Sequence, residues 1–133
     1  MTTVIRKSET VTLTERRREI LHAVSWQVSA GVWSPPTDMY ETENEYVVRV
    51  EVAGMREADF EVVFEGGYLL VNGVRPDVAE RRAYHQMEIR FGKFSTAIGI
   101  PGPVDLDVST AEYHDGFLTV IMPKPKITEA KTE

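Results

Sequence analysis

The chain contains no cysteine, which excludes disulfides, thiolate metal ligands and cysteine nucleophiles. Its 133 residues include no apolar run long enough to span a membrane, and no apolar region with a small-residue cleavage site follows the first residues. There is no Walker A or GxGxxG motif that would hold a nucleotide. We therefore expect no cofactor and no membrane partner, and by default a cytoplasmic location.

Histidine is also scarce, and the three copies, His22, His85 and His114, lie far apart in the sequence. Catalysis by an imidazole needs a nucleophile, a metal or a second acid nearby, and the chain has neither HExxH nor Gly-x-Ser-x-Gly. His114 precedes Asp115-Gly116, a pair typical of a tight hairpin turn. We interpret it as the corner of a hairpin and predict no catalytic residue and no metal site. The protein is not expected to be an enzyme.

The net charge of −6 is unevenly distributed. Residues 1–34 carry five Lys or Arg and three Asp or Glu, whereas residues 35–133 carry ten and eighteen. An acidic main domain repels phosphates, so a nucleic-acid partner is not expected.

The first 34 residues have the pattern of an arm with one amphipathic helix. From Thr14 to about Val28, apolar residues recur at helical spacing. Pro35 and Pro36 end the segment. The apolar side chains of this arm need a partner, which is either the chain's own domain or another chain. They are Ile20, Leu21, Val24, Trp26, Val28 and Trp33. We place a folded domain at residues 35–124 and a flexible tail, rich in Lys, Glu and Thr, at residues 125–133.

After the prolines, apolar residues recur at every second position instead of at helical spacing, which is the pattern of a strand. In residues 46–52 the apolar residues Tyr46, Val48, Val50 and Val52 share one face. Two further strands flank Gly66-Gly67 and end at Asn72-Gly73, another lies in residues 91–100, and a hairpin ends at Pro123. Residues 75–88 are polar and indicate a long loop. Several short strands without helices between them predict an all-β, antiparallel β-sandwich.

Two of these strands have apolar residues on both faces. Leu69 and Val71 are accompanied by Tyr68 and Leu70, and Leu118 and Val120 by Phe117 and Ile121. One apolar face is sufficient for a strand of a two-layer sandwich. Two explanations remain open: the arm covers the second face, or that face belongs to a groove that receives another chain.

Five motifs, in order, resemble those of the small heat shock proteins, the Hsp20/α-crystallin family. The most specific is Ala111 followed after three residues by Asp115-Gly116-Phe117-Leu118, and then by Pro123-Lys124. The others are "YVVRVEVAGM", "DFEV", "YLLVNGVR" and "EIRFGKF…IP". The resemblance covers residues 36–124.

The resemblance implies an immunoglobulin-like β-sandwich, the α-crystallin domain. It also implies a homodimer in which the loop at residues 75–88, with Val78 and Tyr84, lends a strand to the neighbouring subunit. Between the "YLLVNG" and "GFLTVIM" strands it implies a groove for the C-terminal tail of another dimer, so we expect Tyr68, Leu70, Phe117 and Ile121 to line that groove and Ile127 to anchor the tail. Larger homo-oligomers would form through this contact.

Three positions depart from the family pattern. Ala53 stands where many relatives have proline, although the turn glycine Gly54 is kept. Thr96 occupies the place of an arginine that forms an interface ion pair. The tail has Ile127 alone where relatives have a pair of isoleucines, and burying one such side chain contributes only about 1.5–3 kcal/mol. We therefore expect a dimer with small or labile oligomers.

The function that the resemblance implies is that of an ATP-independent chaperone of the stress response. Such a holdase covers the exposed apolar surface of partly unfolded client proteins and prevents their aggregation, through the arm and the groove. Hydrophobic attraction is non-directional, which suits many unrelated clients. The alternative is a co-chaperone or adaptor of the CS/p23-like sandwich class, which binds one folded partner.

Overall fold

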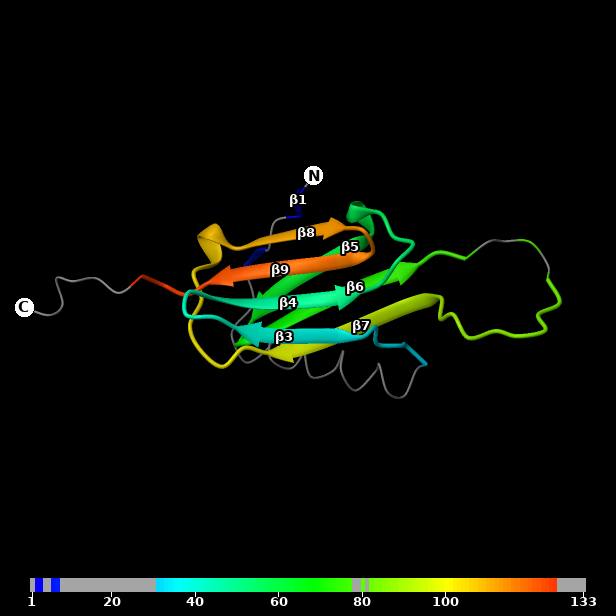
Figure 1. Cartoon of the computed structure of the whole chain (residues 1–133), viewed down its shortest axis with the longest axis horizontal. Coiled ribbons are helices and arrows are strands. Elements are labelled where there is room, and N and C mark those ends of the chain that lie inside the picture. The colour runs from blue at the N-terminus through cyan, green and yellow to red at the C-terminus, as the bar shows by residue number, and fades with distance from the viewer. Residues whose placement is uncertain (1, 4–5, 8–30, 78–79, 81, 127–133) are drawn as a thin grey trace, which may run out of the picture.

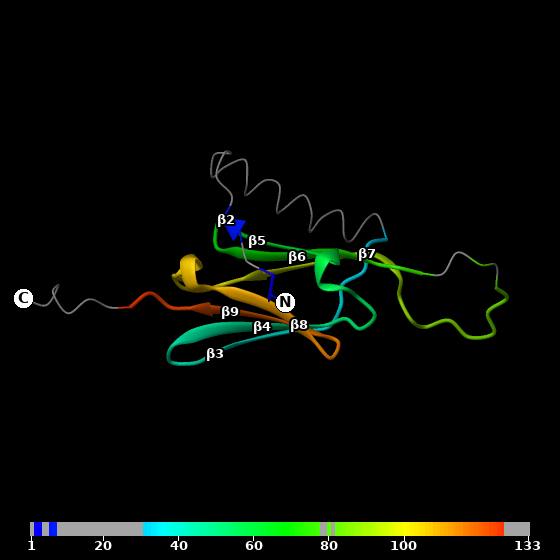
Figure 2. The ribbon, with the colours of Figure 1, turned by 90° about the horizontal axis from the view of Figure 1, so that it is seen from above.

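The computed structural model describes residues 2–3, 6–7, 31–77, 80 and 82–126. Within this part of the chain, two sheets pack face to face, and a long loop and the C-terminal segment leave at opposite ends of the longest axis (Figures 1 and 2). The expected helix from Thr14 to about Val28 lies outside the described residues. The same is true of the proposed client-binding residues Ile20, Leu21, Val24, Trp26 and Val28.

The first sheet has five strands. In order across the sheet they are β1 (Thr2–Thr3), β8 (Thr110–His114), β9 (Phe117–Pro123), β4 (Glu45–Glu51) and β3 (Thr37–Glu41). Every neighbouring pair is antiparallel.

The second sheet has four strands. Across the sheet they are β2 (Arg6–Lys7), β5 (Phe60–Glu65), β6 (Tyr68–Arg75) and β7 (Gly92–Gly99). The β2–β5 pair is parallel and the others are antiparallel. The helical segments among the described residues are two single turns of 3-10 helix, η1 (Glu57–Asp59) and η2 (Leu106–Val108). The predicted all-β sandwich is therefore confirmed.

The hydrophobic core lies between the two sheets, where alternate residues of each strand point inward. The predicted inward face of β4 is confirmed, because Tyr46, Val48 and Val50, together with Val52 just beyond the strand, are all buried. The opposite sheet contributes Leu69, Val71 and Phe94. Strand β9 adds the fully buried side chains of Leu118, Val120 and Met122.

Two tight hairpins have the backbone that their sequences predict. Asp115 and Gly116 join β8 to β9 with φ angles of 52° and 86°, and Gly66 and Gly67 join β5 to β6 with 62° and 84°. Positive φ at both central residues matches the twist of the flanking strands. The interpretation of His114 as the end of a strand at a hairpin corner is confirmed.

The expected end of a strand at Asn72-Gly73 is wrong, because β6 continues to Arg75. A Cβ atom at residue 73 would overlap the ring of Phe94. Glycine is therefore required here by close packing against the core and not by a turn.

Trp33 belongs to the sandwich and not to a client-binding arm, which corrects the prediction from sequence. Its side chain is 7% exposed and is part of the core. The indole Nε1 donates a hydrogen bond to the carbonyl of Gly92 at 3.3 Å, and the ring lies 5.4 Å from that of Phe94. A tryptophan held in this way is not available to an unfolded protein.

Candidate functional site

Among the strands of five residues or more, β3 is the one whose outer edge pairs with no described residue. The edge of β8 is paired with β1, and the edge of β5 with β2. The edge of β7 is covered by Trp33, whose main chain exchanges hydrogen bonds with Lys93 and Ser95 at 3.2 and 3.0 Å. An open edge presents unpaired donors and acceptors, which makes it a template for a further strand. Tyr40 is half-exposed on β3.

The long loop between β6 and β7 spans residues 76–91 and projects beyond the end of the sandwich (Figure 1). The prediction of a long loop is thus confirmed, with its end a few residues later than expected. Val78, one of the two expected dimer contacts, lies outside the described residues. Tyr84, the other, is 46% exposed. Its hydroxyl accepts a hydrogen bond from Arg82 at 3.2 Å, which raises the pKa of that arginine.

The returning half of the loop carries a strand-like pattern without belonging to a strand. Met87 and Ile89 alternate with Glu88 and Arg90, and this period of two is typical of a strand. Both apolar side chains point into solvent, with exposed fractions of 60% and 65%. This pair was not among the residues predicted from the sequence, although its alternation is visible there. Residues 87–90 therefore alternate as a strand does, but they belong to no strand pair among the described residues.

The two ends of the loop are held together by Arg75, the last residue of β6. Its guanidinium donates from Nε to the carbonyl of Arg90 at 2.8 Å and from Nη1 to the carbonyl of Ala53 at 3.2 Å. It also lies 4.5 Å from the ring centroid of Trp33, within the range of a cation–π contact. This arrangement, which we call the Arg75 clamp, fixes the direction in which the loop leaves the sandwich.

The structure does not bring the four expected groove residues together. Strands β6 and β9 lie in different sheets, and each has a neighbour on both sides. Leu69 and Leu118 of these strands point into the core, so the alternate residues point away from it on opposite faces of the molecule. Tyr68 and Leu70 lie on one outer face, and Phe117 and Ile121 lie on the other. The expectation of a groove between these two strands is wrong.

Phe117 has a different contact on its own face. The guanidinium of Arg49, from the adjacent strand β4, lies 4.2 Å from the centroid of its ring. This cation–π contact covers part of the ring and accounts for the half-burial of an outward-facing phenylalanine.

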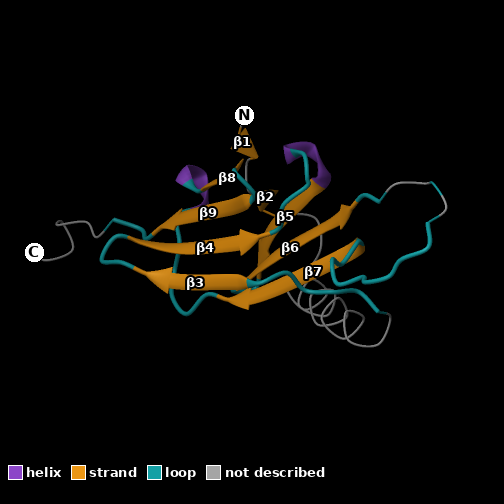
Figure 3. Cartoon of the chain, turned by 45° about the vertical axis from the view of Figure 1, so that its right-hand side comes forward, coloured by secondary structure: helices purple, strands orange, loops and turns teal. Residues whose placement is uncertain are grey.

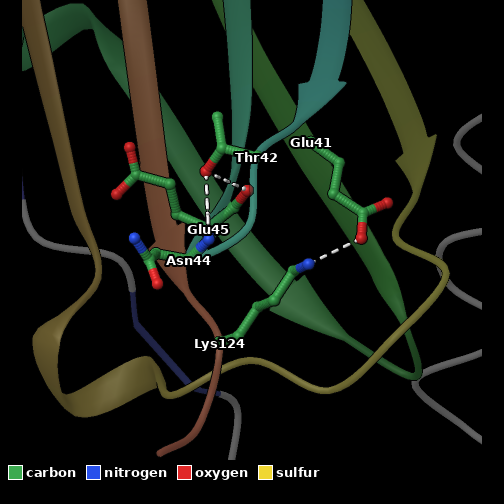
Figure 4. Close-up of polar contacts among 5 residues, drawn as sticks. All are labelled: Glu41, Thr42, Asn44, Glu45 and Lys124. Atoms are coloured by element: carbon green, nitrogen blue, oxygen red, sulfur yellow. Dashed lines mark hydrogen bonds and ion pairs between the residues drawn. The ribbon is translucent and has the colours of Figure 1, made fainter.

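The segment that leads into the C-terminal tail is pinned to the turn between β3 and β4 (Figure 4). Lys124 forms an ion pair with Glu41 at 2.6 Å, and its main-chain N–H donates to the carbonyl of Asn44 at 2.8 Å. Thr42 stabilises the same turn by accepting hydrogen bonds from the main chain of Asn44 and Glu45. The Pro-Lys motif therefore sets where the tail begins. Ile127, the expected tail anchor, lies outside the described residues.

The other two departures from the family pattern have structural roles of their own. Thr96 is buried, and its hydroxyl lies 3.3 Å from that of Thr37, so the pair joins β7 of one sheet to β3 of the other. Ala53 supplies a carbonyl to the Arg75 clamp. Next to it, Gly54 adopts a φ of 82°, which confirms the expected requirement for glycine in this turn.

His114 and Asp115 are in contact with each other but not with a larger polar site. The imidazole Nε2 and the Asp115 carboxylate are 3.0 Å apart, and both side chains are 82% exposed. In the part of the chain that the structure describes, no three His, Asp or Glu side chains are grouped so as to hold a metal ion. The same residues include no helix that is long and apolar enough to cross a membrane.

Comparison with known proteins agrees with this architecture. The family model of the Hsp20/alpha crystallin family matches residues 38–133, which include both sheets from β3 onward. The chain belongs to the Hsp20/α-crystallin family. The α-crystallin sandwich expected from the five motifs is thus confirmed, and the immunoglobulin-like fold with it.

Several heat shock proteins are similar to this Hsp20-family chain in sequence. Small heat shock protein C4 of Rickettsia felis is 32% identical over 102 residues, which are 75% of this chain and 63% of that protein. Heat shock protein 16 of Schizosaccharomyces pombe is 32% identical over 107 residues, or 77% of this chain and 75% of that protein. The chain thus spans less than two thirds of the length of the Rickettsia protein.

Solved structures of small heat shock proteins share the fold. Heat shock protein 16.0 from Schizosaccharomyces pombe superimposes with a TM-score of 0.64 at 31% identity, covering 72% of this chain and 91% of the other. A small heat-shock protein from Xylella fastidiosa, described as having a distinct high order structure, gives a TM-score of 0.65 at 30% identity and covers 72% of this chain and 90% of the other.

Proposed function

We propose that this protein is an ATP-independent holdase that works as a strand-exchanged homodimer. The observation that carries the dimer is the combination of the open edge of β3 with a projecting loop whose returning half alternates as a strand does. Membership of the Hsp20/α-crystallin family supports the chaperone role.

The dimer would form by strand addition, in which the returning half of the loop pairs with β3 of the neighbouring subunit. Main-chain hydrogen bonds supply affinity in this mode, and alternate side chains supply specificity. Met87 and Ile89 are exposed and occupy alternate positions. In an added strand, both side chains would lie on the same face and would be buried there. The Arg75 clamp supports the proposal because it directs the loop away from its own subunit.

A charge placed on this face tests the dimer. Ile89→Glu should shift the mass measured by light scattering after size-exclusion chromatography from dimer towards monomer, because the new carboxylate would lose its hydration on pairing. The matched control is Val108→Glu, which changes a residue of similar exposure, 54%, on the η2 turn. A dimer that survives Ile89→Glu, or that both variants disrupt equally, would contradict strand exchange.

Client proteins would be bound by the apolar side chains of the arm, Ile20, Leu21, Val24, Trp26 and Val28. Burial of apolar surface needs no defined geometry, so one arm can serve many clients. The acidic main domain would keep the resulting complexes in solution.

A heat-labile client whose aggregation is followed by light scattering tests this role. The chain should suppress scattering at equimolar ratio, and Leu21→Ser/Val24→Ser should require at least three times more chain for half-suppression. Val108→Ser is the control. No suppression by the wild-type chain would refute the holdase, and suppression unchanged by the arm variant would refute the arm as the client site. A pull-down that returns one folded partner in stoichiometric amount would favour the adaptor alternative instead.

We also propose larger homo-oligomers, held together by the tail and weakened because Ile127 is its only isoleucine. The distinct high order structure described for the Xylella fastidiosa relative supports the proposal of assembly beyond the dimer. Sedimentation at increasing concentration tests it, and a dimer that never grows would refute it. The cytoplasm remains the proposed location, which cell fractionation would check.

A further inference from the structure

Methionine supplies all the sulfur of this protein, because the chain has five methionines and no cysteine. Four of the five lie in the part of the chain that the structure describes. Met55 and Met122 are buried in the core, and Met39 is half-buried against it. Met87 is 60% exposed. Among the described residues, the thioether that is most open to solvent is therefore the one in the long loop.

Met87 lies in the returning half of this loop, which stands clear of both sheets (Figure 3). The residues on either side of it contact each other, because Nε2 of Gln86 donates a hydrogen bond to Oε2 of Glu88 at 2.7 Å. In an extended segment, residues 86 and 88 share one face and residue 87 lies on the other. Met87 therefore shares its face with the exposed Ile89 and not with the polar pair.

An exposed thioether is a target for oxidation by peroxides. The sulfur lone pair attacks one oxygen of hydrogen peroxide, so that an S–O bond forms and the O–O bond breaks. The transferred oxygen gives its proton to the departing hydroxide, which leaves as water. The sulfur is oxidised and the peroxide is reduced, and no third reactant is needed. The product, methionine sulfoxide, is polar where methionine is apolar. No thiol of the protein competes for the peroxide, because the chain has no cysteine.

We propose that Met87 is an oxidative modification site that controls dimer formation, with a small peroxide as its co-substrate. The inference rests on the proposed strand-exchanged dimer, in which Met87 and Ile89 are buried against β3 of the neighbouring subunit. Burial stabilises a thioether there, whereas the sulfoxide oxygen loses its hydration without gaining a partner. Oxidation should therefore weaken the dimer about tenfold.

The dimer in turn protects Met87. The side chain is exposed in the single subunit that the structure describes, and pairing with a neighbour covers it. Peroxide therefore reaches the sulfur when the subunits separate, and oxidation of Met87 should slow as the protein concentration rises. An oxidised subunit pairs less tightly, so the modification holds subunits apart until methionine sulfoxide reductase removes the oxygen.

Peroxide treatment of the whole chain tests the proposal. Peptide mass spectrometry should find oxygen added at Met87 before it is added at Met39, Met55 or Met122. Light scattering across a dilution series should then show a dimer about tenfold weaker. Treatment with methionine sulfoxide reductase and a thiol should restore the original dimer.

Three variants assign the effect to one side chain. Met87→Leu keeps an apolar side chain of similar volume without sulfur, so its dimer should survive peroxide. Met87→Gln carries a polar group in place of the thioether and should form the weaker dimer without any peroxide. The matched control Met39→Leu removes the half-buried thioether and should respond to peroxide like the wild type. All three variants keep Met1, so oxidation there cannot produce a difference among them.

Three outcomes would overturn the proposal. The first is an unchanged dimer after Met87 has been oxidised, the second is equal weakening of the wild type and Met87→Leu by peroxide, and the third is faster oxidation of Met39 than of Met87. Failure of the proposed dimer looks different. If Met87→Gln and Ile89→Glu both leave the untreated dimer intact, strand exchange is refuted and this inference falls with it.

Discussion

Replacing the guanidinium of the Arg75 clamp should loosen the root of the long loop. Arg75→Gln removes the charge-assisted hydrogen bonds to the carbonyls of Arg90 and Ala53 and the cation–π contact with Trp33. Hydrogen bonds to charged groups contribute about 1.5–3 kcal/mol. An exposed cation–π contact adds about 0.5–1 kcal/mol. The lower ends of these ranges, for two hydrogen bonds and one cation–π contact, give about 3.5 kcal/mol. Because Arg75 is only half-buried, solvent screening weakens these contacts, and we expect a loss of about 2 kcal/mol.

Urea unfolding measures this loss. With a slope of about 2 kcal/mol per molar urea, the midpoint should fall by about 1 M. The series should be run at several protein concentrations, because a dimer gains stability by mass action. Hydrogen exchange should also rise in residues 82–91. The control is Arg49→Gln, which removes a cation–π contact with Phe117 at 4.2 Å and should cost only about 0.5–1 kcal/mol.

Arg75→Lys separates charge from geometry. An ammonium keeps the charge but lacks the planar fork that reaches two carbonyls and stacks on an indole, so its midpoint should fall between those of the wild type and Arg75→Gln. Equal midpoints for Arg75→Gln and Arg49→Gln, or unchanged exchange in the loop, would show that the clamp does not hold the loop and would refute the reasoning.

Three further predictions concern the sandwich itself, and urea unfolding checks each of them. Gly73→Ala should lower the free energy of unfolding by about 1–3 kcal/mol, because the new methyl group overlaps Phe94. The control Gly99→Ala gains an ordinary contact of 3.6 Å with Tyr68 and should lower it less. A larger loss for Gly99→Ala would contradict the packing argument. Leu118→Ala should cost about 2–5 kcal/mol through loss of a fully buried side chain, against about 0.5 kcal/mol or less for the outward-facing Thr119→Ala. His114→Ala should change the free energy of unfolding by no more than about 0.5 kcal/mol and should leave suppression of client aggregation unchanged. A large loss of suppression would support a functional role for His114 that is not structural.

Local patterns in the sequence were sufficient to predict the strands whose two faces differ. The alternation of apolar and polar residues at 46–52 predicts a strand with one buried face. The pairs Asp115-Gly116 and Gly66-Gly67 predict tight turns, because these residues adopt positive φ angles readily. Strand β3 was missed because Thr37–Glu41 is mostly polar and has one half-buried apolar residue, Met39, so its conformation depends on pairing with β4. The two-residue strands β1 and β2 are too short for any period to be visible.

The candidate site was harder to predict than the fold because it depends on which strands become edges. The family resemblance implied a groove between β6 and β9, which would have explained the apolar residues on both faces of each strand. Strand order instead places the two outer faces on opposite sides of the molecule. Trp33 was assigned to the arm because it follows a helical pattern, and only the contact with Phe94 shows that it belongs to the core. Strand order cannot be read from a local sequence pattern, and neither can a contact between two residues that are 61 positions apart in the sequence.

The pinning of Lys124 to Glu41 places the departure of the tail at one tip of the elongated body, while the long loop leaves from the other (Figure 1). If the loop and the tail both bind neighbouring subunits, as we propose, each subunit is bivalent and the two contacts do not compete for space. Loss of the tail contact alone would then divide a larger assembly into dimers and leave each dimer whole.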